Sequence, residues 1–114
     1  HLQLRLNVAG REQHRSYSLV GLPAEVPGAY RIAVKRLDDG RGGSKAMWSL
    51  AVGDTLTASA PQNHFALSLD AIDTLLVAGG IGITPLVGMA QTLVRLGRRV
   101  RLLYAVRNDA ELAY

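Results

Sequence analysis

Ala78-Gly79-Gly80-Ile81-Gly82-Ile83-Thr84-Pro85 is the stretch of this sequence that decides the fold. It ends a short apolar run over residues 75–78, which is typical of a parallel strand buried on both faces. Pro85 suits the first turn of a helix, where its missing N–H costs little, and Gly97 suits a helix end. The pattern predicts a helix over residues 84–96 and a second strand over residues 100–106, which together make a β-α-β unit.

The same glycine-rich turn is a candidate nucleotide site. Glycines let the backbone turn sharply and let a ligand approach the main chain, and the free N–H groups at a helix start favour an anion. Gly79, Gly80 and Gly82 provide this chemistry, so we predict that a dinucleotide binds there. The spacing departs from the G-x-G-x-x-G fingerprint, and the alternative is a tight turn needed only for packing.

The first seventy residues predict strands instead of a β-α-β unit. Leucines at positions 2, 4 and 6 alternate with polar residues, which predicts a strand over residues 2–8. Further strands are predicted over residues 15–20, 30–37 and 55–60, with a turn at residues 21–28 that includes Pro23 and a short helix from residue 44 to about residue 50. These elements make most of a small antiparallel barrel.

The change of character near Ala71 predicts two domains, over residues 1–70 and 71–114. The fold class is therefore β plus α/β: a partial antiparallel barrel followed by the start of a parallel nucleotide-binding domain. We expect the first domain to be incomplete at its N-terminal side and the second at its C-terminal side, so that the chain is a fragment.

Arg15-Ser16-Tyr17-Ser18 is a second candidate site, on a predicted strand. Alternation places Arg15 and Tyr17 on one face of the strand, with Ser16 and Ser18 on the other. A flat, anionic ligand could use the guanidinium for a phosphate, the ring for stacking and a hydroxyl for a heteroatom. The alternative is that these are ordinary solvated side chains on a barrel surface.

Arg41-Gly42-Gly43-Ser44-Lys45 leads into the predicted short helix and is the third candidate. Glycines, flanking cations and a serine at the N-cap could hold a phosphate at the start of that helix. The alternative is an ordinary helix that Ser44 caps after a flexible turn.

Taken together, these motifs resemble the ferredoxin-NADP reductase superfamily, and within it the phthalate dioxygenase reductase and vanillate O-demethylase reductase branch. That family has an R-x-Y-S strand in a flavin-binding barrel and a GGIGITP turn in a nicotinamide domain, and both motifs occur here in that order. Residues 32–36 with 40–44, Gly53-Asp54 and residues 59–65 are also similar to this branch. The resemblance covers essentially the whole chain.

The resemblance implies a role for each matching residue. Arg15 and Ser16 would contact the flavin phosphate and ribityl region, and Tyr17 would pack near the isoalloxazine. The candidate catalytic residues are Ser18, near the reactive edge of the flavin, and Thr84, which would reach it from the second domain. The remaining candidates for cofactor binding are Ala33, Val34 and Lys35 along the flavin, Arg41, Gly42, Gly43 and Ser44 at its phosphate, and Gly79, Gly80, Gly82 and Pro85 at the nicotinamide nucleotide.

The implied cofactors are FMN, with FAD as the alternative, and NADH or NADPH. A hydride would pass from the nicotinamide to the flavin, and single electrons would then pass to a [2Fe–2S] domain outside this chain and on to a Rieske-type oxygenase. We expect this chain by itself not to sustain NADH oxidation. Two other classes stay open: a binding module for a phosphorylated ligand without redox chemistry, and a structural domain whose glycine turns only pack. Arg107 could favour the 2′-phosphate of NADPH, whereas Asp109 could favour the ribose hydroxyl of NADH, so the sequence leaves both nucleotides open.

Composition narrows the function further. The formal net charge is +4, but the basic residues are dispersed and lack interleaved aromatics, which argues against a nucleic-acid-binding surface. The chain has no cysteine, so it can hold neither a disulfide nor a thiolate-ligated cluster, and its three histidines at positions 1, 14 and 64 are too scattered to predict a metal site. Glycines and Pro85 interrupt the longest apolar stretch, and we expect a cytoplasmic protein without a membrane partner.

Overall fold

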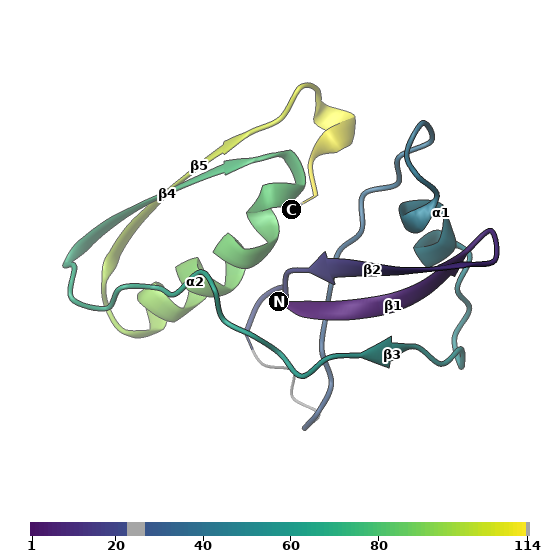
Figure 1. Cartoon of the computed structure of the whole chain (residues 1–114). Helices are drawn as coiled ribbons and strands as arrows, with labels where there is room; N and C mark the ends of the chain where they lie inside the picture. Colours follow the sequence, from purple (N-terminus) through teal and green to yellow (C-terminus); the bar gives the residue numbers. More distant parts are fainter. Residues whose placement is uncertain (23–26, 114) are drawn as a thin grey trace. The chain divides into compact units, whose positions relative to one another are not determined.

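The computed structural model describes residues 1–22 and 27–113, and these divide into two compact units. The first unit comprises His1–Ser18 and Val34–His64, and the second comprises Leu19–Ala33 and Phe65–Tyr114. The elements of both can be followed along the chain in Figure 1. The predicted domain boundary between residues 70 and 71 stays a prediction, and Pro23 in the predicted turn lies outside the described residues.

The first unit is built on a three-stranded antiparallel sheet in the order β2-β1-β3. Its strands are β1 (Leu2–Val8), β2 (Arg11–Tyr17) and β3 (Thr57–Ala58). The leucines of β1 are buried and the residues between them are exposed, so the strand predicted from alternation is confirmed. Ala9 and Gly10 join β1 to β2 with φ of 50° and 76°, the left-handed conformation that suits a two-residue hairpin turn.

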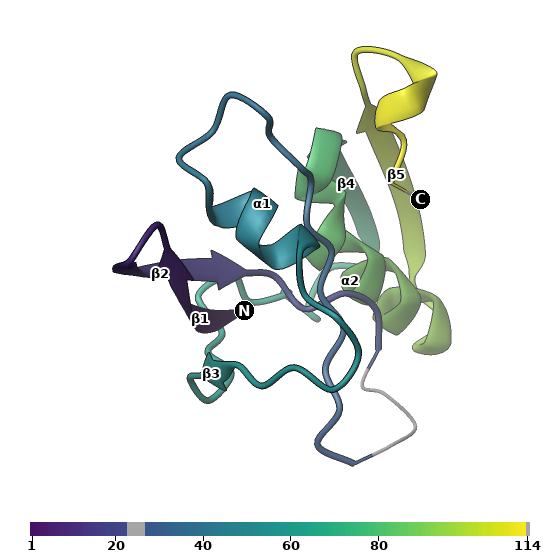
Figure 2. The same ribbon diagram turned by 90° about the vertical axis from the view of Figure 1, so that its right-hand side faces the viewer.

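Helix α1 (Gly43–Trp48) belongs to the same unit and packs beside β1 (Figure 2). The predicted helix is therefore confirmed, but the predicted N-cap is wrong. Gly42 takes the capping position in the left-handed conformation, and Ser44 stands inside the first turn. The Ser44 hydroxyl instead bonds with the main chain of Leu37, seven residues earlier.

The strand predicted over residues 30–37 is wrong. Within the described residues only Ile32 forms a β-bridge there, with Leu19, next to a hydrogen bond from the Val20 N–H to the Arg31 carbonyl. Farther along, side chains of α1 bind the main chain at Val34 and Leu37, so the segment is held without a neighbouring strand. Two other predicted strands have different bounds, because β2 ends at residue 17 and β3 covers only residues 57–58.

The second unit contains the predicted β-α-β unit, drawn in green to yellow in Figure 1. Strands β4 (Asp73–Gly79) and β5 (Arg99–Ala105) pair in parallel, and α2 (Ile83–Arg95) packs against both. Two 3-10 turns, η1 (Gly80–Gly82) and η2 (Asp109–Glu111), stand before α2 and after β5. The buried core consists of Leu76, Ala78, Ile83, Leu86 and Leu93. The predicted fold class is confirmed.

Gly88 of α2 lies against the main chain of Gly21. A Cβ added at Gly88 would lie 2.5 Å from the carbonyl oxygen of Gly21, which itself has a φ of 76°. The backbone of residue 21 therefore approaches the helix too closely for any side chain at position 88.

Among the described residues, no helix is long and apolar enough to cross a lipid bilayer.

We expect Gly88→Ala to destabilise the protein. Alanine in a helix is ordinarily more favourable than glycine by about 1 kcal/mol, but overpacking typically costs about 1–3 kcal/mol and a carbonyl group cannot rotate away as a side chain can. The expected result is a net loss of about 1 kcal/mol in the free energy of unfolding, measured by denaturant titration. Val94→Ala, at an exposed position of the same helix, should change it by less than about 0.5 kcal/mol. A Gly88→Ala protein as stable as the wild type would contradict the close approach.

Candidate functional site

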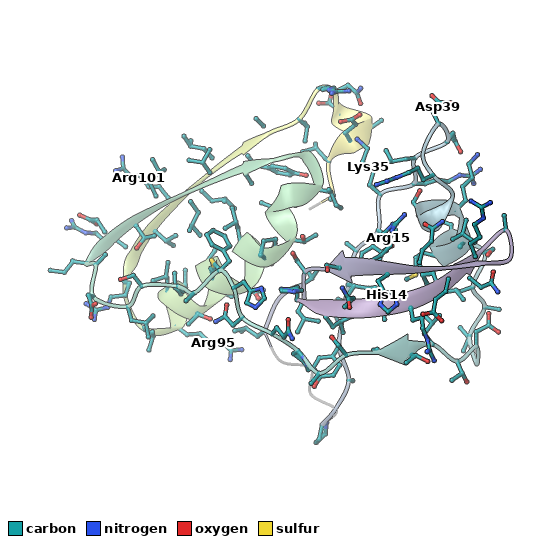
Figure 3. All side chains as sticks on the ribbon, viewed as in Figure 1. His14, Arg15, Lys35, Asp39, Arg95 and Arg101 are labelled. Carbon is teal, nitrogen blue, oxygen red and sulfur yellow. The ribbon has the colours of Figure 1, made fainter. Side chains whose placement is uncertain are left out.

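The face of β2 that carries Arg15 and Tyr17 is the first part of the site. Both side chains are half-buried, whereas His14 and Ser16 between them are exposed, so the predicted sharing of one face is confirmed. Figure 3 shows Arg15 and His14 on the strand that bears them. The Arg15 guanidinium donates to the main-chain carbonyl of His14 at 2.8 Å and to the side-chain oxygen of Gln13. These bonds fix the direction of the guanidinium along the strand.

The turn before α1 lies directly against this arginine. A Cβ added at Gly43 would lie 3.1 Å from the Nε atom of Arg15, and Gly43 is buried. Glycine at this position therefore makes room for the guanidinium beside the backbone of the turn. Two of the three predicted motifs, which are far apart in the sequence, meet here within one unit. A guanidinium beside a glycine turn is chemically suited to a phosphate group, because Arg offers several N–H donors in a planar fork.

Gly42 has both a backbone and a spatial reason to be glycine. Its φ is 84°, and a Cβ there would lie 2.6 Å from a methyl carbon of Val8 on β1. The turn is therefore seated against the first strand of the sheet. This seating fixes the position of the neighbouring Gly43 and Ser44 relative to β1 and β2.

Tyr17 contributes a neutral hydroxyl to the same face. Burial raises the pKa of the Tyr17 phenol above its usual value of 10.0, and the nearby Arg15 charge acts in the opposite direction with a smaller effect. The phenol thus stays protonated at neutral pH. A protonated phenol can donate a hydrogen bond, and its ring can stack on a flat ligand.

The segment after residue 33 carries the other predicted flavin contacts of this unit. Val34 is half-buried, and Lys35 and Arg41 are exposed cations. Sequence reasoning missed Trp48, whose indole N–H donates to the Val34 carbonyl at 2.9 Å. The four-residue spacing of Ser44 and Trp48, which puts both on one face of a helix, is the signal that could have found it.

The glycine-rich turn after β4 is the site in the second unit. In the described part of the chain, no atom beyond the adjoining residues lies within 4 Å of a Cβ built at Gly79, Gly80 or Gly82. The φ of 50° at Gly80 favours glycine, whereas Gly79 and Gly82 have backbone angles that any residue adopts. Open space at these glycines allows a ligand to approach the main chain, as a nucleotide phosphate requires.

Thr84 and Pro85 stand in the first turn of α2. The Thr84 side chain is buried, and its hydroxyl donates to the Ile81 carbonyl at 3.0 Å, which stabilises the bend from η1 into the helix. Ala33 also belongs to the second unit, whereas Ser16 and Ser18 belong to the first. The predicted contacts of all these residues with a cofactor stay predictions.

The remaining polar clusters lie outside the predicted motifs. His14 bonds with Glu12 at 3.1 Å and with Gln3 at 3.3 Å, and the rings of His1 and His64 meet edge to face at 5.0 Å. A pocket of about 550 Å³ in the first unit has Arg5, Glu12, Ser49 and Thr57 in its lining and includes none of the predicted site residues. Within the described residues, no group of three or more potential ligands is arranged to hold a metal ion.

Comparison with known proteins finds a family match for each of two parts of the chain. Residues 1–67 match the family described as Oxidoreductase FAD-binding domain, and residues 76–114 match the Oxidoreductase NAD-binding domain. The heme-dependent oxidative N-demethylase beta subunit of Ectopseudomonas mendocina is 44% identical over 115 residues, which cover 100% of this chain and 36% of that protein. The phenoxybenzoate dioxygenase subunit beta of Ectopseudomonas oleovorans is 45% identical over 109 residues, covering 95% of this chain and 33% of that protein.

A solved structure agrees as well. Phthalate dioxygenase reductase, described as a modular structure for electron transfer from pyridine nucleotides to [2Fe-2S], superimposes with a TM-score of 0.76 at 40% identity. The match covers 94% of this chain and 33% of that chain. The chain thus spans about a third of the length of the curated relatives it matches.

By fold and by family match, the chain combines an antiparallel sheet in the part that matches the oxidoreductase FAD-binding domain family with a β-α-β unit in the part that matches the NAD-binding domain family. The chain belongs to the ferredoxin-NADP reductase superfamily, and its relatives include phthalate dioxygenase reductase and other oxygenase reductase subunits.

Proposed function

We propose that this chain is part of a reductase that moves electrons from NAD(P)H through FMN to a [2Fe–2S] centre and on to a Rieske-type oxygenase. The observation that carries the proposal is the Arg15 guanidinium lying against Gly43, so close that a Cβ added at Gly43 would be 3.1 Å from its Nε atom. A phosphate held there would put the ring of the same cofactor over the face of β2 that carries Tyr17. Several of the relatives are named as reductase subunits of oxygenases, which supports the choice of acceptor.

Residues of this chain would bind and orient the two cofactors. Arg15 and the turn Arg41–Ser44 would hold the flavin phosphate, and the neutral Tyr17 would pack beside the ring. Gly79, Gly80 and Gly82 would admit the nicotinamide nucleotide to the main chain, and Thr84 would reach toward the flavin. A bound flavin would supply the conversion of a two-electron hydride donor into single-electron steps. Orientation of two rings in contact is what the protein adds to that chemistry.

An absorption spectrum tests this function. The purified protein should bind FMN and show flavin absorption that NADH or NADPH bleaches. A colourless protein that takes up no flavin on reconstitution, yet binds a phosphorylated ligand, would replace the proposal with a binding module free of redox chemistry. A binding module would use the same contact between Arg15 and Gly43. Only flavin binding and its reduction by NAD(P)H therefore distinguish the reductase from the binding module.

The same experiment addresses the choice of cofactor. FMN is proposed over FAD because the phosphate turn Arg41–Ser44 is short, and chromatography of the released flavin distinguishes them. Arg107 would favour a 2′-phosphate and Asp109 a ribose hydroxyl, so bleaching rates with NADH and NADPH decide between them. We propose a cytoplasmic location, which cell fractionation tests.

The variant Gly82→Ala tests whether glycine at this position is needed for nucleotide binding or only for the fold. Gly82 has a φ of −63° and open space around its Cβ position, so alanine should leave the free energy of unfolding within about 0.5 kcal/mol. If a nucleotide approaches the main chain here, the added methyl group should weaken NAD(P)H binding by about tenfold. Titration of nucleotide into the protein, followed by flavin bleaching and calorimetry, measures this. Gly97→Ala, beyond the end of α2, is the control and should leave nucleotide affinity unchanged; unchanged affinity in Gly82→Ala would argue for packing alone.

A further inference from the structure

The indole of Trp48 is anchored at one edge although its ring is exposed. Trp48 is 60% exposed, so its ring contributes little to a buried core. Its Nε1–H nevertheless donates to the Val34 carbonyl at 2.9 Å, a normal length for a well-formed hydrogen bond. The side chain is therefore placed to hold a main-chain segment instead of filling space.

The segment that it holds is not part of a sheet. Among the described residues, 33–37 belong to no strand, so the main chain there depends on other partners. Leu37 has its partner in Ser44, whose hydroxyl accepts from the Leu37 N–H at 3.0 Å and contacts its carbonyl at 3.4 Å. Val34 has its partner in Trp48.

Both partners come from one face of α1. Ser44 and Trp48 are four residues apart in Gly43–Trp48, the spacing that aligns side chains along a helix. The segment 34–37 thus lies along this face and is held near each end by one side chain. Gly43, which contacts Arg15, precedes Ser44 directly, so the turn and the held segment share a support.

We propose that Trp48 is a positioning residue for the flavin ring: its indole N–H holds the Val34 carbonyl and thereby sets the wall formed by Val34 and Lys35. This inference rests on the proposed function and on the place along the flavin that the family resemblance implies for these two residues. It assigns to α1 two distinct tasks. The start of the helix seats the turn beside Arg15, and its last residue sets the main chain along the ring.

Removal of the N–H alone tests the inference sharply, because Trp48 is the only tryptophan in the chain. Global replacement of tryptophan by benzothienylalanine keeps the size of the ring and substitutes sulfur for the N–H. Trp48→Phe removes the N–H together with part of the ring. 5-Fluorotryptophan, which keeps the N–H, is the matched control.

Dissociation constants for FMN and for riboflavin, which lacks the phosphate, are measured for each protein. We expect benzothienylalanine and Trp48→Phe to weaken binding of both ligands by about fivefold, because one neutral hydrogen bond is lost at the ring wall. The flavin absorption band should also shift relative to the wild type. The 5-fluorotryptophan protein should match the wild type in both measurements, and the midpoint of denaturant unfolding should change little because the ring is exposed.

The outcomes separate this inference from the proposed function. If the wild type binds FMN and the two N–H-deficient proteins bind both ligands with unchanged affinity and spectra, the positioning role is wrong while the reductase proposal survives. If the wild type binds no flavin at all, the proposed function is wrong and the inference is lost with it. Selective labelling gives an independent readout, since the single indole N–H resonance should exchange slowly with solvent. Fast exchange in the free protein would show that the bond to Val34 does not form and would overturn the inference.

Discussion

Replacing Arg15 by alanine is expected to raise the dissociation constant for FMN by about tenfold to a hundredfold, because a hydrogen-bonded charge pair with phosphate is lost. The guanidinium lies against Gly43 and is directed by the His14 carbonyl and the Gln13 side chain, so its place beside the turn is fixed. Fluorescence titration of FMN into the protein measures the change. The dissociation constant of Arg15→Lys for FMN should lie between those of the wild type and Arg15→Ala, since lysine keeps the charge and loses the planar fork.

Riboflavin and a second arginine provide the controls for this result. Riboflavin lacks the phosphate, so its affinity should be nearly the same in wild type and Arg15→Ala. Arg11→Ala removes an exposed arginine from the same strand and should leave FMN affinity unchanged. An equal loss of affinity for FMN and riboflavin in Arg15→Ala would show that Arg15 acts on the ring or on the fold, and the phosphate would then have to be held elsewhere.

Replacing Gly42 by alanine should lower the free energy of unfolding by about 3 kcal/mol, the largest effect on stability expected for a single methyl group in this chain. Two causes add. A left-handed backbone with φ of 84° costs a residue with a Cβ about 1–2 kcal/mol, and the new methyl group would lie 2.6 Å from a carbon of Val8. Valine is short and branched, so rotation about χ1 is its only way to relieve this contact, and that rotation costs energy unless the new rotamer is also free of clashes. Denaturant titration measures the loss.

Gly10→Ala isolates the backbone contribution. Gly10 has a similar φ of 76°, and nothing among the described residues lies within 4 Å of its Cβ position. This variant should therefore lose only about 1 kcal/mol, and the difference from Gly42→Ala measures the contact with Val8. Equal losses in the two variants would mean that the turn is not seated on β1 as the structure has it.

The parts of the fold that could be predicted from sequence are those encoded by neighbouring residues. Alternation at Leu2, Leu4 and Leu6 identified β1, and the apolar run, glycine turn and Pro85 identified the β-α-β unit. The turn at Ala9–Gly10 was missed because alanine is uncommon in a left-handed turn position. Strand propensity over residues 30–37 misled because β-branched residues favour a strand only where a neighbouring strand can pair with them.

By itself, then, the sequence determined the two modules, their order and the residue types of the candidate site, since each depends on periodicity or on a motif within a few consecutive residues. Only the tertiary structure decided that Arg15 lies against Gly43, that Gly42 abuts Val8, and that Ser44 and Trp48 hold the segment 34–37. The physical reason is that each of these contacts joins groups from different elements. A local pattern specifies which face a side chain occupies, but the backbone path of the whole unit decides which group it meets there.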